Sequence, residues 1–240
     1  MSIDIGQSLQ EGLTRAVSPN GLGLIVVWAV LGVFSQLANN SLMAALYAGL
    51  PVDPTVIGPS LDVSPMAAGL GMLVVYLVSF VVMAGALRTF VTDERRSIPM
   101  AHFTHNLGWM LLNLVVGFIV FYLAVTIGFV LLVVPGIFLL VSLFFWYVLV
   151  IVEDQNFYEA FQNSWTLTKG NRWSLLGIGV IVIFGGSILM GIPLALSFAL
   201  SEWAELVLMV VTTSVFGVVS LAITARVYVQ VAEQGWAAGV

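Results

Sequence analysis

Long apolar segments separated by short polar stretches dominate the chain. About 20 apolar residues in a helix cross a bilayer core roughly 30 Å thick. Stretches of this kind cover residues 21–38, 66–87, 107–152, 173–196 and 204–229. The run 107–152 holds no charged residue, and at about 1.5 Å per residue it is too long for one span. We expect it to fold back between Gly128 and Gly136, where Pro135 lacks a backbone donor and Gly136 permits unusual dihedrals.

Short amphipathic segments precede the first, third and fifth predicted spans. In the N-terminal tail, an apolar residue recurs every four positions from Ile5 to Val17. Ser97-Ile98-Pro99 resembles the start of a helix that would carry Phe103 and Leu107 on one face. Asn156 and Glu159 occupy the first and fourth places of a capping-box variant, and Gly170 is a candidate stop.

These patterns together predict an all-α polytopic membrane protein, with six transmembrane helices and short interfacial amphipathic helices. The whole chain, 1–240, would form a single integral membrane domain. A weak internal repeat divides it into 1–90, 91–153 and 154–231, each an interfacial helix followed by a helical hairpin. Because two spans return the chain to the same side, the three repeats would be parallel. Three unrelated surface helices are the alternative explanation.

Composition supports the membrane assignment and excludes several protein classes. The chain of 240 residues is 60% hydrophobic and only 8% charged, whereas about a quarter of the residues in soluble domains are charged. A net charge of −5 argues against a nucleic-acid partner, which requires a basic patch. The absence of cysteine excludes disulfides and thiol chemistry.

The seven cations indicate the orientation of the chain. With six spans, all seven fall on one side of the membrane: Arg15, Arg88, Arg95, Arg96, Lys169, Arg172 and Arg226. Short cytoplasmic loops accumulate Lys and Arg. We therefore expect a multi-pass protein of the cell membrane with both termini in the cytoplasm.

The predicted spans lack the groups that catalysis requires. No Asp, Glu, Lys, Arg or His lies in the interior of a predicted span, so we expect neither an enzyme nor an ion-coupled pump. His102 and His105 would share a helix face, and a metal site with Asp93 or Glu94 is conceivable. Two imidazoles beside a headgroup layer more often bind phosphate or water, so no metal and no cofactor are assigned.

Two sets of candidate site residues remain. The first set would contact lipid headgroups or the acyl boundary, because it combines cations with an aromatic stripe next to span ends: Arg88, Arg95, Arg96, Phe157, Phe161, Trp165, Lys169 and Arg172. The second set would act in hinges or close helix packing, because it consists of glycines and prolines within or beside spans: Pro135, Gly136, Gly185, Gly186 and Pro193.

One stretch carries a family resemblance. Pro135-Gly136 opens a span, Glu153 follows it, Ala160, Ser164 and Trp165 come next, and Thr168-Lys169-Gly170 precede another span; Tyr228-Val229-Gln230 lie near the end. This pattern resembles the membrane domain attached to some glycerophosphoryl diester phosphodiesterases, and related stand-alone six-span proteins of bacteria and haloarchaea. The resemblance implies a stand-alone membrane domain. It carries over no catalytic residue, because the phosphodiesterase chemistry belongs to a separate soluble barrel of about 250 residues.

Two functions therefore compete at the level of the sequence. The first is a non-enzymatic membrane protein that binds membrane lipids, or a protein partner or second copy in the membrane. The alternative is a permease or facilitator for a small uncharged or amphiphilic solute, suggested by the interrupted 128–136 turn and the glycine-rich fifth span.

Overall fold

The computed structural model describes residues 3–48, 50, 57–94 and 97–237, and within these residues it is helical without a strand. Six segments are long and apolar enough to cross a membrane. They are α2 (Pro19–Tyr47), α3 (Pro65–Val91), α5 (Leu107–Leu131), the pair α6 (Val133–Ser142) and α7 (Trp146–Val152), α9 (Arg172–Leu196) and α10 (Glu202–Ala237). The remaining helices are α1 (Ile5–Ala16), α4 (Ala101–Thr104), α8 (Phe157–Leu167) and the 3-10 turn η2 (Ser197–Ala199). The predicted all-α multi-pass architecture is confirmed.

Polar side chains fix where several helices begin. Asp4 accepts a hydrogen bond from the Gln7 amide at 2.9 Å and starts α1. Ser18 and Ser64 cap α2 and α3 in the same way, and each is followed by a proline at the first helical position. The Asn156 side chain accepts from two amides of α8, which confirms the predicted cap of that helix.

The predicted reversal of the long apolar run is also confirmed. Helix α5 ends at Leu131 and α6 begins at Val133, inside the expected 128–136 window. Gly128 and Gly136 face each other, and a Cβ atom on Gly128 would lie 3.0 Å from the Gly136 Cα. Pro135 occupies the first turn of α6, where the missing N–H has no intrahelical partner to lose.

The structure corrects two predicted segment boundaries. The first span was expected to end near residue 38, but α2 continues to Tyr47 because Asn40 and Ser41 bond to the following loop at Pro59 and Leu61. The helix expected from Ser97 onward is only the single turn α4. It stops because Asn106 takes a left-handed conformation, with φ of 51°, and redirects the chain into α5.

The fourth span is broken, which the sequence pattern did not predict. Helix α6 ends at Ser142, residues 143–145 form a turn, and α7 starts at Trp146. Apolar side chains continue through the break, so hydropathy gives no sign of it. The partners of the interrupted backbone come from α8, as described below.

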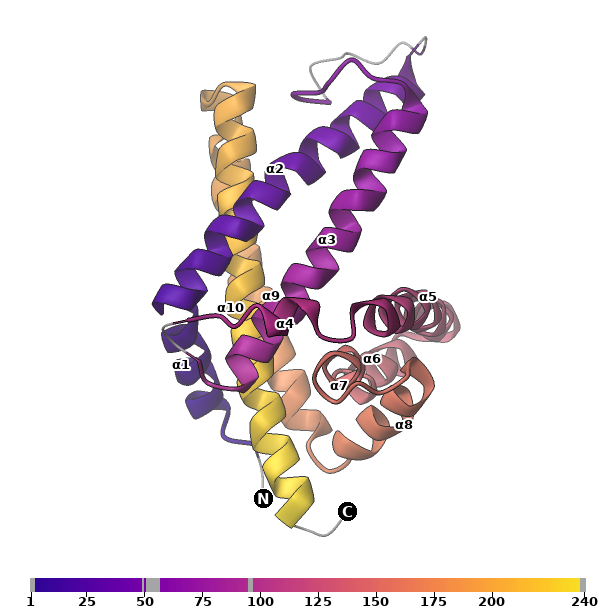
Figure 1. Ribbon diagram of the computed structural model, residues 1–240, viewed down its shortest axis with the longest axis vertical. Helices are drawn as coiled ribbons and strands as arrows, with labels where there is room; N and C mark the ends of the chain where they lie inside the picture. Colours follow the sequence, from indigo (N-terminus) through magenta and orange to yellow (C-terminus); the bar gives the residue numbers. More distant parts are fainter. Residues whose placement is uncertain (1–2, 49, 51–56, 95–96, 238–240) are drawn as a thin grey trace.

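The buried core lies at one end of the helices and not along their whole length. Leu87, Leu114, Trp146, Leu175 and Val218 are each at most 2% exposed, and they come from the end of α3, the start of α5, α7, the start of α9 and the second half of α10. Away from this core the hairpins diverge (Figure 1). The α2–α3 pair leans away from α9 and α10, while α5 is seen almost end-on.

The three amphipathic segments differ in length and in what they contact. They contain 12, 4 and 11 residues, and they pack against α10, α3 and α7 respectively. The division into repeats 1–90, 91–153 and 154–231 stays a prediction.

Candidate functional site

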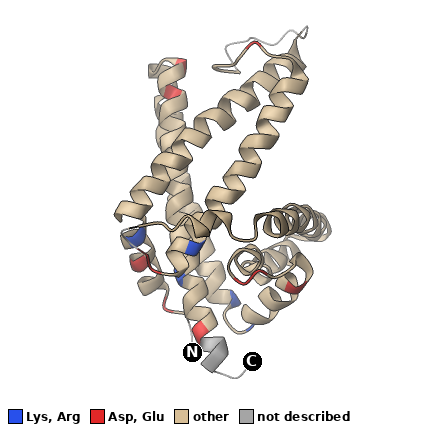
Figure 2. Cartoon of the chain, in the orientation of Figure 1, with Lys and Arg blue, Asp and Glu red and all other residues tan. Residues whose placement is uncertain are grey.

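The cations that the structure describes gather at one end of the molecule, which we call the cation-bearing end. Figure 2 shows Lys and Arg only in the half opposite the tips of the α2–α3 and α9–α10 hairpins. The residues concerned are Arg15, Arg88, Lys169, Arg172 and Arg226. The buried core lies at the same end.

Arg88 is a buried connector between three chain segments. Its Nε donates to the Ile151 carbonyl at 2.9 Å, and its Nη1 donates to the carbonyls of His102 and His105 at 2.9 and 3.2 Å. Its Nη2 lies 3.8 Å from an Asp154 carboxylate oxygen. The expectation that Arg88 reaches lipid headgroups is wrong, because only 7% of the residue is exposed and its donors serve helix-end carbonyls.

Asp154, next to Arg88 and partly exposed, contacts several other polar groups. Its Oδ2 lies 2.8 Å from His105 Nε2, and its Oδ1 accepts from Asn106 at 3.3 Å. The Trp109 indole donates to its backbone carbonyl at 3.3 Å. Asp154 has a positive φ of 53°, which turns the chain from α7 toward α8. The carboxylate is partly exposed, so it joins the buried Arg88 to the surface.

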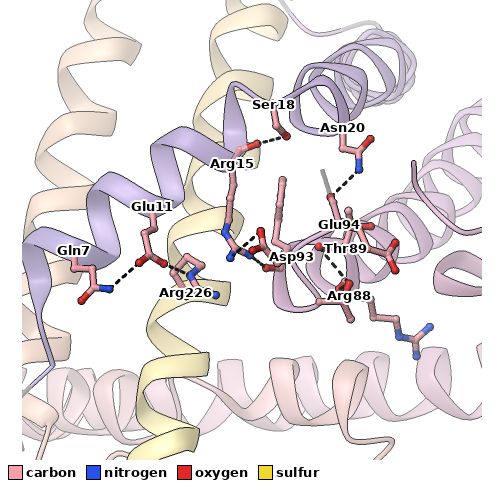
Figure 3. Close-up of polar contacts among 12 residues, drawn as sticks. Gln7, Glu11, Arg15, Ser18, Asn20, Arg88, Thr89, Asp93, Glu94 and Arg226 are labelled. Carbon is pink, nitrogen blue, oxygen red and sulfur yellow. Dashed lines mark hydrogen bonds and ion pairs between the residues drawn. The ribbon is translucent and has the colours of Figure 1, made fainter. Parts of the chain in front are cut away.

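Ion pairs fasten α1 to the rest of the cation-bearing end (Figure 3). Arg226 on α10 lies 2.5 Å from Glu11, which also accepts from the Gln7 side chain at 2.8 Å. Arg15 pairs with Asp93 at 3.0 Å. Arg15 also donates to the backbone carbonyl of Phe90, near the end of α3.

These contacts lower the pKa of Glu11 below its ordinary value. The hydrogen bond from Gln7 is the largest cause, and the bond and positive charge of Arg226 act in the same direction. Partial burial acts against them by disfavouring the charged carboxylate.

Close packing of α1 on α10 depends on a small residue. The face that α1 buries consists of Ser8, Gly12, Arg15 and Ala16. A Cβ atom on Gly12 would lie 2.7 Å from the Ile223 Cα, so any larger side chain would push the helices apart.

Helix α8 supplies the hydrogen-bond partners of the α6–α7 break. The Ser164 hydroxyl accepts from the Phe145 amide at 3.1 Å and donates to the Ser142 carbonyl at 3.2 Å. Thr168 donates to the same carbonyl at 3.2 Å. Both hydroxyl residues are fully buried. A broken helix inside an apolar environment requires such partners, because water cannot replace them.

The aromatic stripe of α8 faces the protein. The Phe161 ring packs edge-on against Trp146 with centroids 5.2 Å apart, and Phe157 packs against Phe161. Trp165 contacts the Phe138 ring at 5.2 Å and remains 40% exposed. The opposite face of α8 carries exposed polar residues, and Phe157 and Phe161 are partly buried, so their contact with the acyl boundary stays a prediction.

Arg172 and Lys169 lie beside α8 in different environments. The Arg172 guanidinium stacks on the rings of Phe138 and Trp165, at 4.5 and 4.8 Å from their centroids. It thereby joins α6, α8 and α9. Lys169 is exposed next to Gly170, whose φ of 90° turns the chain into α9. Lys169 is therefore the better placed of the two to meet a headgroup.

The other predicted residues have mixed outcomes. Arg95 and Arg96 lie outside the described residues. Gly186 packs closely, since a Cβ there would lie 2.5 Å from the Phe216 ring. Gly185 has no such neighbour within 4 Å, so its hinge or packing role stays a prediction. Pro193 is buried within α9, which ends three residues later.

The two histidines point to different partners. His102 Nδ1 lies 3.2 Å from the Thr89 hydroxyl, and its Nε2 is 4.0 Å from Glu94. His105 instead contacts Asp154. Among the described residues, no group of three or more His, Asp or Glu side chains is arranged to hold a metal ion.

Sequence reasoning missed the residues that hold this end together. Arg15, Asp154, Ser164 and Thr168 were not singled out for this role. One signal was available for Ser164 and Thr168: they follow Ala160 at helical spacing and form a small-residue face on α8. The arrangement of ion pairs and capped backbone joins helices, and it leaves Lys169 and His105 exposed at the rim.

Comparison with known proteins gives one match. Residues 3–231 match the model of a family described as Domain of unknown function (DUF7847). No curated protein matches the chain, and no solved structure matches it either. The resemblance to membrane domains of glycerophosphoryl diester phosphodiesterases stays a prediction. Because the match covers nearly the whole chain, this multi-pass membrane protein belongs to the DUF7847 family.

Proposed function

We propose that this chain is a non-enzymatic protein of the cell membrane that binds membrane lipids, with the cation-bearing end and both termini in the cytoplasm. One observation carries the proposal: the main buried core lies at the cation-bearing end, and much of the helix surface away from it is exposed and apolar. Beyond the core the helices present apolar side chains outward, such as Val26 and Phe34 on α2 and Leu194 on α9, which are 63%, 57% and 75% exposed. Lipid acyl chains are the natural cover for such surfaces.

The cation-bearing end supports headgroup binding through a small number of groups. Lys169 is exposed and unscreened by the aromatic rings that hold Arg172. A cation near an anionic membrane surface contributes about 1 kcal/mol of attraction. Most other described cations are committed to carbonyls and carboxylates, so we assign the headgroup role to Lys169 first.

The polar groups within the spans favour lipid binding over a permease. A solute path requires polar groups that point into it. Thr212 and Ser214 each donate to a carbonyl of their own helix at 2.7 Å, and Ser187 does the same at 2.8 Å. Asn113 bonds to the Phe157 amide at 3.0 Å and thereby joins α5 to α8. These groups therefore bond within their own helix or join two helices.

Native mass spectrometry of the full chain, released from mild detergent, tests the proposal. We expect phospholipid retained at a defined ratio, with anionic species enriched. The Lys169→Ala variant should lower that enrichment on the order of fivefold, as one lost cation implies. Gln162→Ala, on the exposed face of the neighbouring helix α8, alters no charge, so it is the control and should leave the enrichment unchanged. A bare chain, or a stoichiometric protein partner in place of lipid, would contradict the proposal.

A further inference from the structure

The tip of the α5–α6 hairpin is unlike the other two hairpin tips, because it is entirely aliphatic. Five consecutive residues, 130–134, form it: Val130, Leu131, Leu132, Val133 and Val134, which are 80%, 69%, 68%, 62% and 76% exposed. No charged residue occurs anywhere between Leu107 and Val152. Of the three hairpin tips, this is the one whose exposed side chains are all aliphatic.

The other two tips carry groups suited to water or headgroups. The segment that joins α2 to α3 includes Ser60, Asp62 and Ser64, all exposed. The α9–α10 connection contains Ser201 followed by Glu202, and both are exposed. The contrast indicates that the α5–α6 tip meets a different environment.

The direction of the hairpin agrees with this difference (Figure 1). Helices α2, α3, α9 and α10 extend along the long axis of the molecule to the end opposite the cations. The α5, α6 and α7 helices stay at the height of the cation-bearing half and run across that axis (Figures 1 and 2). Helix α5 has 25 residues, enough at about 1.5 Å per residue to cross a bilayer if upright. Its direction, and not its length, therefore decides where the tip lies.

Part of the backbone of the tip is paired within the protein. The reversal uses one non-helical residue, Leu132, whose amide bonds to the Gly128 carbonyl at 3.1 Å. The Gly136 amide bonds back to the Leu132 carbonyl, and Pro135 has no amide to satisfy. These bonds reduce the number of polar backbone groups that the tip would present to hydrocarbon, where each unpaired group is costly.

We propose that the α5–α7 hairpin enters the membrane from the cation-bearing side and ends among the acyl chains of the leaflet on that side. Its tip, residues 130–134, does not emerge at the far surface. In this arrangement α2, α3, α9 and α10 cross the whole bilayer, and the middle hairpin lies within one leaflet. This inference goes beyond the lipid-binding proposal and does not require a headgroup contact at Lys169.

Thiol labelling gives the first test, since the chain has no cysteine. Single-cysteine versions of the full chain, Leu132→Cys, Asp62→Cys and Glu159→Cys, are compared in inverted and right-side-out membrane vesicles with a membrane-impermeant maleimide. The two control sites should react from opposite sides. Leu132→Cys should react at least tenfold more slowly from either side, because maleimide requires a hydrated thiolate. All three should react equally after denaturation in detergent.

A second measurement identifies the leaflet. Purified Leu132→Cys is labelled with bimane, reconstituted, and its outer monolayer is loaded with a doxyl-labelled phosphatidylcholine. The orientation of the chain is measured first: labelling of Glu159→Cys from outside gives the fraction of molecules whose α8 faces outward. The preparation is chosen so that this fraction differs from one half. The quenched fraction of bimane fluorescence should equal it.

Three results would overturn the inference. The first is labelling of Leu132→Cys from the Asp62 side as fast as Asp62→Cys itself. The second is labelling from the Glu159 side as fast as Glu159→Cys. The third is a quenched fraction equal to the fraction of molecules whose α8 faces the vesicle interior. Val130→Cys, two positions away on the same tip, repeats the test if Leu132→Cys fails to fold. Loss of lipid enrichment in Lys169→Ala leaves all of these readouts unchanged, so the two proposals fail separately.

Discussion

Arg88 and Lys169 are both cations next to a span end, yet only Arg88 is buried. The difference lies in what surrounds each side chain. Arg88 is next to the carbonyls at the ends of α4 and α7, which have no partners in their own helices. Lys169 lies in an exposed turn before α9. A charge at a membrane surface can therefore be structural or lipid-facing, and sequence position alone does not distinguish the two.

Replacing Arg88 should destabilise the protein severely. Arg88→Ala removes three charge-assisted hydrogen bonds and leaves buried carbonyls without donors, which costs about 3–5 kcal/mol in free energy of unfolding. Lys169→Ala should change it by less than about 0.5 kcal/mol, as for an ordinary surface site. Thermal unfolding of both variants in the same detergent measures the difference. Equal unfolding temperatures would show that Arg88 does not join the helices.

The contact of Glu11 with Arg226 should depend on pH. Because the folded-state pKa of Glu11 lies below the ordinary value of 4.5, the carboxylate stabilises the docked α1 at pH values above 4.5. That contribution is lost as the pH falls below 4.5 and through the lowered pKa. Limited proteolysis of α1 between pH 7 and pH 3 should show increasing cleavage in the native chain. Glu11→Gln should reduce this pH dependence, with the Arg15–Asp93 pair supplying the remainder, whereas Glu159→Gln on exposed α8 should leave it at the native level.

At the scale of helices, α9 shows that glycine content does not by itself indicate packing. Gly185 and Gly186 are adjacent, but they point in different directions from the helix. Only Gly186 faces α10, where the Phe216 ring fills the space that a side chain would need. Gly185 is exposed at the apolar surface.

The two glycines therefore form a matched pair for substitution. Gly186→Ala should reduce stability by about 1–3 kcal/mol, because the Phe216 ring or α10 must move. Gly185→Ala should leave stability unchanged or raise it by up to about 1 kcal/mol, since alanine favours helix more than glycine. Unfolding temperatures of the two purified variants provide the measurement. A larger loss for Gly185→Ala would place the α9–α10 contact on the wrong face.

The elements also show what could be predicted from the sequence. Hydropathy located the spans, Pro135 and Gly136 located the reversal, and Asn156 located the start of α8, because each depends on local chemistry. The break at 143–145 and the inward direction of the α8 aromatic stripe were missed. In a membrane, the side facing protein and the side facing lipid are both apolar, so hydropathy does not separate them.

The same limit applied to the polar residues of the cation-bearing end. Burial of Arg88 depends on carbonyls that are distant in sequence, such as that of Ile151, 63 positions away. Such contacts follow from helix arrangement and not from local pattern. The small-residue face of α8 was the one local signal for the contact between α8 and the α6–α7 break.

At the scale of the whole molecule, packing decreases with distance from the buried core. Helix α5 samples both environments within one element. Leu114 near its start is fully buried, whereas Leu123, further along, is 54% exposed. The inner part of the helix therefore belongs to the protein core, and its outer part belongs to the lipid-facing surface.

This gradient predicts unequal effects of one substitution at two sites. Leu114→Ala should cost about 2–5 kcal/mol, because it leaves a cavity in the packed core. Leu123→Ala should cost less than about 1 kcal/mol, since lipid or detergent can occupy the vacated space. Chemical denaturation of the two variants in the same detergent compares them. Similar losses at both sites would show that the core continues along α5.

The ion pair between Glu11 and Arg226 joins residues 215 positions apart, and this has a consequence for biosynthesis. A ribosome makes α1 before α10, so the surface on which α1 docks does not exist until α10 has been synthesised. The small-residue face around Gly12 stays open during that time. Docking of α1 therefore requires that α10 has been made, and a nascent or truncated chain without α10 exposes this face to quality-control proteases.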